Sequence, residues 1–189
     1  MIEFTVGEVS FRICFSFLFI AALMTLISGD TAAEALLACI LHETGHMAAM
    51  AAFGMKIRTV SFYGAGIKIT RRKGRIFPVW QEAAVLAAGC AVNFLLYTIF
   101  RSSRFGLINL FLGAFNLLPA GALDGGRLLR LTAAEGFKTD FRRALNICRT
   151  AGCLTAFFLA VSAFVLNIGN ITVYAAAAFM LITALTENS

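Results

Sequence analysis

The sequence predicts an all-α polytopic membrane protein with about six transmembrane helices and a small membrane-associated β-hairpin after the second helix. Of its 189 residues, 60% are hydrophobic and only 14% are charged, and the mean hydropathy is +0.85. This composition is typical of integral membrane proteins, in which a helix needs about 20 apolar residues to cross the hydrocarbon core. We expect one domain, 1–189. Apolar runs of roughly spanning length cover 11–28, 32–53, 83–100, 105–123, 150–166 and 168–185.

The basic residues are distributed unequally between the two sides that six spans create. Two of them, Arg101 and Arg104, lie on one side, and the other fourteen share the side of both termini. Because cytoplasmic loops are enriched in Lys and Arg, both termini are predicted to be cytosolic. The net charge of +6 is then explained by orientation in a lipid bilayer, and no nucleic-acid partner is expected. The fourteen are Arg12, Lys56, Arg58, Lys68, Arg71, Arg72, Lys73, Arg75, Arg127, Arg130, Lys138, Arg142, Arg143 and Arg149.

The N-terminus and the cysteines give no sign of a secreted, disulfide-bonded protein. Residues 1–10 lack a basic region and include Glu3 and Glu8, so the first apolar run is interpreted as a retained span. The five cysteines contain no C-x-x-C pair and lie in mostly apolar segments, which favours small buried side chains. They are Cys14, Cys39, Cys90, Cys148 and Cys153.

Two histidines, the only ones in the chain, lie four residues apart in the run Leu41-His42-Glu43-Thr44-Gly45-His46. On a helix, residues i and i+4 share a face, so both imidazoles can bind one ion while Glu43 reaches a water beside it. The pattern H-E-x-x-H is the signature of zinc proteases. A carboxylate at the centre of a membrane helix costs about 2.5 to 3.5 kcal/mol, and a divalent cation compensates for such groups. The motif therefore predicts a metal site inside the bilayer.

A tetrahedral zinc needs a further protein ligand, and Asp, Glu and Cys are the remaining candidates. Most acidic residues lie in predicted termini or connections, or near span ends. Asp124 differs, because it closes the fourth predicted span behind Pro119, which breaks the helix, and before Gly125 and Gly126, which allow close backbone approach. Irregular backbone at membrane depth is tolerated where it lines a cavity or is buried in protein. Asp124 is therefore the candidate third ligand.

The pair of motifs, H-E-x-x-H at 42–46 and N-x-x-P-x-x-x-x-D-G at 116–125, resembles the site-2 protease family of intramembrane zinc metalloproteases, peptidase family M50. The resemblance covers a catalytic core of about 32–130. It implies that His42, His46 and Asp124 bind Zn2+ and that Glu43 is the catalytic residue that activates water. The intervening span of the family often bears G-P-x-x-N. Here 89–93 reads Gly-Cys-Ala-Val-Asn, and the missing proline concerns the local helix geometry, not the metal site.

Six spans with the motifs in the second and fourth resemble the stage IV sporulation protease group, which cleaves a membrane-associated pro-sigma factor. Because the chain ends at Ser189, we expect the form without the C-terminal regulatory domain, and without an inserted PDZ domain. The resemblance implies regulated intramembrane proteolysis of a membrane-associated protein substrate, with sporulation as one setting. It leaves open the substrate, the cleavage position and any inhibitory membrane partner.

The predicted activity is hydrolysis of a peptide bond in or near a transmembrane segment, and two other classes compete with it. A metal-ion transporter would use the same ligands, but transport needs several polar positions along a path, and the first, fifth and sixth spans offer almost none. A non-catalytic membrane scaffold has no need for a general base such as Glu43.

Three further features have open roles. Asn93 and Asn116 are candidates for binding the substrate backbone or stabilising the intermediate, with a polar contact between helices as the alternative. The segment 56–70 combines β-formers with a glycine turn and predicts a hairpin whose edge an extended peptide could join, an ordinary cytosolic loop being the alternative. The amphipathic segment 127–146 lies on the cytosolic leaflet or contacts a substrate.

Overall fold

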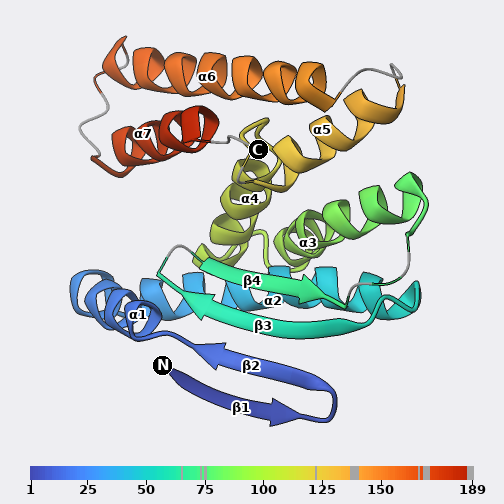
Figure 1. The fold of residues 1–189 in the computed structure, drawn as a ribbon. Coiled ribbons are helices and arrows are strands. Elements are labelled where there is room, and N and C mark those ends of the chain that lie inside the picture. The colour runs from blue at the N-terminus through green and yellow to red at the C-terminus, as the bar shows by residue number, and fades with distance from the viewer. Residues whose placement is uncertain are drawn as a thin grey trace. The chain divides into compact units, whose positions relative to one another are not determined.

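The computed structural model describes residues 1–64, 66–72, 74, 76–121, 123–136, 141–165, 167 and 171–186. These residues form two compact units, Met1–Gly113 and Ala114–Ser189 (Figure 1). The fold is mostly helical with one small sheet, as the sequence predicts.

The first unit contains a four-stranded sheet in the order β1-β2-β3-β4 (Figure 1). Strands β1 (Ile2–Val6) and β2 (Val9–Ile13) form an antiparallel hairpin whose turn includes Gly7, with a φ of 62°. Strand β3 (Ile57–Tyr63) is parallel to β2, and β4 (Gly66–Arg71) is antiparallel to β3. The hairpin predicted over 56–70 is therefore confirmed as β3 and β4, with Ala65 outside the described residues. The β1–β2 hairpin was not predicted.

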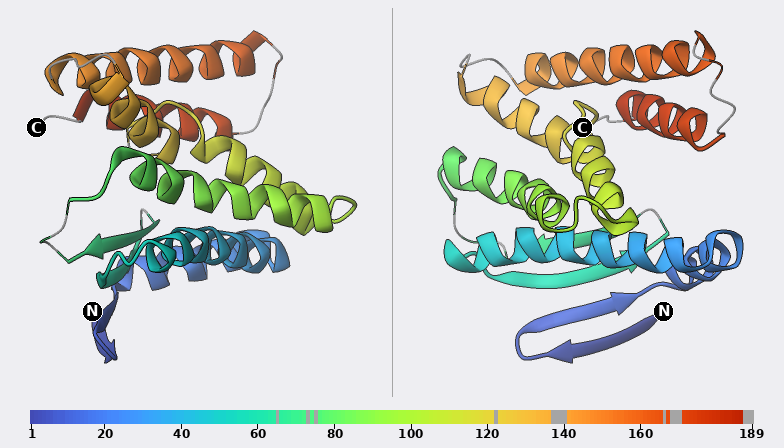
Figure 2. Two further views of the ribbon diagram at one scale, coloured as in Figure 1. Left: turned by 90° about the vertical axis from the view of Figure 1, so that its right-hand side faces the viewer. Right: turned by 180° about the vertical axis from the view of Figure 1, so that it is seen from behind.

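Four helices complete the first unit: α1 (Phe15–Ser28), α2 (Asp30–Ala52), α3 (Val79–Ile99) and most of α4 (Arg104–Asn116). Helices α2 and α3 pack closely because Gly45 has no side chain. A Cβ there would lie 2.8 Å from both Ala88 O and Val92 Cγ2. The strands β3 and β4 run beside α2 (Figures 1 and 2). Their Ile57 and Ile69 pack on a core of Met50, Met55 and Val85.

The second unit consists of the end of α4, the Pro119 loop, α5 (Asp124–Gly136), α6 (Phe141–Val165) and α7 (Ile171–Thr186). Helices α6 and α7 lie side by side (Figure 2). The loop packs on them through a core of Ala120, Leu123, Ala156 and Met180. Arg149 Nε of α6 donates a hydrogen bond of 3.2 Å to Ala184 O of α7. The loop that precedes Asp124 is therefore anchored within its own unit.

Three helices of the described chain are long and apolar enough to cross a membrane: Asp30–Ala52, Val79–Ile99 and Arg142–Val165. The apolar helices Phe15–Ser28 and Val173–Thr186 are shorter, so the predicted count of six spans is not confirmed. The run predicted as 11–28 becomes helical only at Phe15 because residues 9–13 belong to β2. The run predicted as 105–123 ends as a helix at Asn116, just before Pro119.

The amphipathic segment predicted over 127–146 is divided between two helices. Its first part lies in α5 and its last part in α6, while 137–140 fall outside the described residues.

Candidate metal centre

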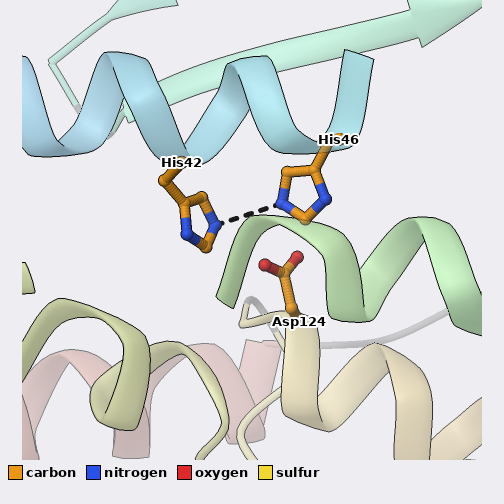
Figure 3. Close-up of side chains that lie close together, drawn as sticks. All are labelled: His42, His46 and Asp124. Atoms are coloured by element: carbon orange, nitrogen blue, oxygen red, sulfur yellow. Dashed lines mark hydrogen bonds between the residues drawn. The ribbon is translucent and has the colours of Figure 1, made fainter. Parts of the chain in front are cut away.

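Helix α2 carries His42 and His46 on one face, as the i, i+4 spacing predicts. Both side chains are buried, with 5% and 7% of their surface exposed. Their Nε2 atoms are 3.1 Å apart and the rings are nearly perpendicular, at 85° (Figure 3). Two imidazole nitrogens therefore face one point beside the helix.

The ring of His46 is oriented by the backbone of α3. Its Nδ1 lies 2.7 Å from Val85 O. A carbonyl oxygen only accepts hydrogen bonds, so Nδ1 carries the hydrogen and donates it. In the neutral ring, the Nε2 of His46 then holds a lone pair that is available to a metal.

The ring of His42 is oriented by a chain of side-chain amides. Asn109 Nδ2 donates to Phe105 O at 2.9 Å, which leaves Asn109 Oδ1 to accept from Asn93 Nδ2 at 2.8 Å. Asn93 Oδ1 then accepts from His42 Nδ1 at 2.6 Å. Because the chain ends at a carbonyl, its direction is fixed at every step. The Nε2 of His42 is left with a lone pair, as in His46.

The geometry of His42 and His46 shows whether the two rings suit a metal ion. Two neutral imidazoles with lone pairs facing each other at 3.1 Å repel, and a proton or a cation between them removes the repulsion. In a tetrahedral zinc site with Zn–N bonds of about 2.0 to 2.1 Å, two nitrogen ligands lie about 3.3 to 3.4 Å apart. Metal-bound histidines also commonly donate their other ring N–H to a carbonyl or a side chain. The pair therefore fits two neighbouring ligands of one zinc ion.

Gly89 of α3 permits the close approach of α3 to both rings. A Cβ at this position would lie 2.5 Å from His46 Nε2 and 2.8 Å from His42 Cε1. Sequence reasoning noted Gly89 only as part of a motif, and it missed Asn109. The signal for Asn109 was a polar residue inside an apolar run, which membrane helices rarely carry without a polar partner.

The predicted residues outside the imidazole pair have different surroundings. Asn93 is fully buried and contacts His42 and Asn109, so a polar contact between helices, the alternative for this residue, is confirmed. Its role in binding substrate stays a prediction. Glu43 follows His42 on α2 and is partly exposed, whereas both histidines are buried. Asn116, the last residue of α4, is also partly exposed.

Asp124, also drawn in Figure 3, is the first residue of α5 in the second unit, and 7% of its surface is exposed. A carboxylate in the first turn of a helix interacts favourably with the helix dipole. Gly125 and Gly126 lie against the backbone of Leu117 and Ala120, where a Cβ would collide. Cys148 Sγ of α6 donates to Gly126 O at 3.3 Å. The start of α5 is therefore fixed within its own unit.

Comparisons with known proteins give a family and two relatives. Residues 102–161 match the model of peptidase family M50. The chain is 30% identical over 142 residues to a zinc metalloprotease of Methanocaldococcus jannaschii, covering 63% of this chain and 39% of that protein. It is 29% identical over 174 residues to stage IV sporulation protein FB of Bacillus subtilis, covering 79% and 60%. The chain thus spans less than two thirds of these relatives.

The fold is also similar to a solved structure, a site-2 protease from Methanocaldococcus jannaschii. The TM-score is 0.69, and the match covers 100% of this chain and 95% of that chain at 21% identity. At this identity, the likeness shows a shared fold.

Proposed function

We infer that this chain, which belongs to the site-2 protease family of peptidase family M50, is a membrane zinc metalloprotease. It hydrolyses a peptide bond in or near the transmembrane segment of a membrane-associated protein. One observation carries this inference: two buried imidazoles on one apolar helix have their Nδ1 hydrogens engaged and their Nε2 atoms 3.1 Å apart. A buried pair of this kind is suited to bind a metal, and Glu43, the first of the three residues between the two histidines, is a carboxylate.

The proposed ligands of Zn2+ are His42, His46 and Asp124. Each offers one donor atom of a type that zinc prefers, and all three are buried. When bound, zinc lowers the pKa of water and polarises the carbonyl that is attacked.

Glu43 is the proposed general base. It takes a proton from the attacking water and later donates it to the amine that leaves when the peptide bond breaks. A positioned acid or base of this kind contributes about 10²- to 10⁴-fold to the rate. Glu43 is partly exposed beside two buried histidines, which suits a group that exchanges protons with water.

The substrate is proposed to bind as an extended strand. A peptide bond inside a helix is shielded and already hydrogen-bonded, so the substrate helix has to unwind before cleavage. Strand β4 is an outermost strand of the sheet, and its outer edge suits main-chain pairing with an added strand. Asn116 is a candidate for contact with the substrate backbone. The asymmetry of basic residues supports cytosolic termini, and six spans in total remain part of the proposal.

Co-expression with membrane-tethered candidate substrates tests the activity, and a pro-sigma factor is the first to try. Wild type should give a shortened product, whereas Glu43→Gln should give none while still carrying about one zinc per chain. Glu82→Gln is a matched control, because Glu82 is a partly exposed acid paired with Arg71 at 3.1 Å, far in sequence from the motif. Cleavage by Glu43→Gln would contradict the role of Glu43.

Asp124→Asn tests the ligand set, because an amide is a weaker zinc ligand than a carboxylate. The zinc content of the purified variant should fall. An unchanged content would mean that another group supplies the third ligand. Metal flux into vesicles without any proteolysis would favour the transporter over the protease.

A further inference from the structure

Strand β4 is an outermost strand of the sheet, and its two faces differ in character. Ile67 and Ile69 are partly buried on one face, where Ile69 packs on the core of the unit. Lys68 lies between them in sequence, on the opposite face, and is exposed. A peptide that pairs with this edge as a strand therefore meets an apolar face and a basic face in alternation.

The charge of Lys68 has no negative partner in its row of the sheet. The residue opposite Lys68 is Ser61 of β3, and the residue opposite Ser61 is Arg12 of β2. Arg12 is compensated, because its Nε donates to Glu3 Oε1 of β1 at 2.9 Å. Among the described residues, no salt bridge joins Lys68 to an acid.

A strand added to β4 would continue this row. Directly opposed side chains on neighbouring strands have their Cβ atoms about 4.5 to 5.5 Å apart, so opposite charges stabilise the pairing and like charges weaken it. An acidic side chain opposite Lys68 would repeat, at this edge, the pair that Glu3 and Arg12 form at the other edge. Lys68 therefore suits a partner strand that brings an acid.

The place of β4 in the fold favours such a partner. The strand runs beside α2 (Figures 1 and 2), which is long and apolar enough to cross a membrane. Ionisable side chains at membrane depth are rare and are usually paired with an opposite charge or used in function.

A lysine on an edge strand also works against pairing between two copies of a protein. A second copy of this chain, paired edge to edge through β4, would bring its own Lys68 to the same face, where the two charges repel. The same side chain thus disfavours one kind of strand and favours another. Specificity at a binding edge arises from such a difference.

We propose that Lys68 determines which substrates pair with β4. The paired segment carries an acidic residue opposite Lys68, between apolar residues that lie on the face of Ile67 and Ile69. This inference rests on the proposed binding of the substrate to β4 as an extended strand. Lys68 contacts a side chain of the substrate and takes no part in the chemistry at the metal.

Photo-cross-linking tests this preference without cleavage. The full chain carries Glu43→Gln, so that the substrate is not consumed, and a photo-reactive residue in place of Thr70, which is exposed on the same face as Lys68. The probe is a membrane-tethered pro-sigma factor whose charged residues next to its membrane segment are replaced by serine. A single Glu or a single Lys is then introduced, one position at a time.

At the position that pairs with Lys68, cross-linking should be about 2- to 5-fold stronger with Glu than with Lys. Lys68→Glu should reverse this order, and Lys68→Gln, which keeps the length of the side chain without its charge, should remove the preference. Arg58→Glu is the matched control. It makes the same change of charge at an exposed position of β3, one strand away from the edge, and should leave the order unchanged.

Four outcomes decide between this inference and its alternatives. An unchanged order in Lys68→Glu would overturn the role of Lys68, and so would an equal reversal in Arg58→Glu. A chain that cross-links to none of the probes, or only to a second copy of itself, would overturn the pairing of substrate with β4. Cleavage of the same probes by the chain with Glu43 intact is measured separately. Cross-links that follow the charge of the probe without any cleavage would support the pairing and contradict the proteolytic activity.

Discussion

His42 and His46 present the same atom to the same point, yet different kinds of partner orient them. His46 donates to a backbone carbonyl, Val85 O, which no substitution at that position removes. His42 donates to the side chain of Asn93, which is held in turn by Asn109. The orientation of His46 is thus built into the packing of α2 against α3. That of His42 depends on two side chains and can be removed without moving a helix.

Gly89→Ala should have the largest effect, because it acts on both rings at once. Its Cβ would lie 2.5 Å from His46 Nε2 and 2.8 Å from His42 Cε1, so α3 has to move away or the rings have to turn. Overpacking of this kind costs about 1 to 3 kcal/mol. We expect zinc affinity to fall about 100-fold or more, which exceeds the fall expected when a single orienting partner is removed. Competition with a chelator measures the affinity.

Gly152→Ala is the matched control for this substitution. It adds the same methyl group to a helix, α6, with the nearest atoms, Ala184 Cβ and Pro119 O, at 3.2 Å, and its nearest atoms include none of the groups that orient His42 or His46. Alanine has a higher helix propensity than glycine, by about 1 kcal/mol. A loss of zinc affinity in either variant therefore cannot result from a weakened helix. Equal losses in the two variants would refute the specific role of Gly89.

Asn93→Leu should have the next largest effect and should act on His42 alone. Leucine has a similar volume but accepts no hydrogen bond, so the Nδ1 hydrogen of His42 loses its partner. Removal of such an orienting partner typically costs about 10- to 100-fold in metal affinity. Asn93→Asp keeps an acceptor and should recover most of the loss, which a mere packing defect would not allow.

The ring nitrogens provide a direct readout. The chain has two histidines, so in protein labelled with nitrogen-15 in the histidine rings, the nitrogen NMR spectrum contains only the signals of these two rings. In metal-free wild type both rings should carry the hydrogen on Nδ1. In Asn93→Leu only His46 should retain this tautomer strictly, because Val85 O is unchanged. A spectrum in which both rings change together would remove the distinction between them.

The difference between the two histidines also marks how far the sequence could predict the site. The placement of His42 and His46 on one face follows from their spacing, a local property of α2. The partners Val85, Asn93 and Asn109 lie on α3 and α4, and only the packing of three helices decides which groups meet. A single sequence does not contain that information.

The sheet shows the same limit. The β3–β4 hairpin was predicted because its alternation is interrupted by a glycine turn. Strands β1 and β2 alternate equally well, from Ile2 to Val6 and from Val9 to Ile13. From Phe11 into α1, however, Arg12 is the only charged residue, and helix and strand are ambiguous in such an apolar run. Pairing of β2 with β3, about fifty residues away in sequence, settles it as a strand.

Asn109→Leu should have a smaller effect than Asn93→Leu, because it acts on His42 only through Asn93. The Nδ2 of Asn93 would lose its acceptor in a fully buried position, which costs about 1 to 3 kcal/mol of stability. Asn93 could then turn its amide, so we expect zinc affinity to fall at the low end of the range, about 10-fold. In the double variant the loss should equal that of Asn93→Leu alone. Additive losses would mean that Asn109 acts by another route.

Glu34→Gln should have the smallest effect, and it separates helix placement from ring orientation. Arg104, the first residue of α4, donates two hydrogen bonds to Glu34 of α2, at 3.0 Å and 2.8 Å. This pair joins the same two helices that the chain from Asn109 to His42 joins, but it is exposed and touches no imidazole. Exposed ion pairs contribute little and are screened by salt, so zinc affinity should stay within about twofold of wild type. A loss as large as that of Asn109→Leu would mean that the spacing of α2 and α4, and not the orientation of the amides, prepares His42 for the metal.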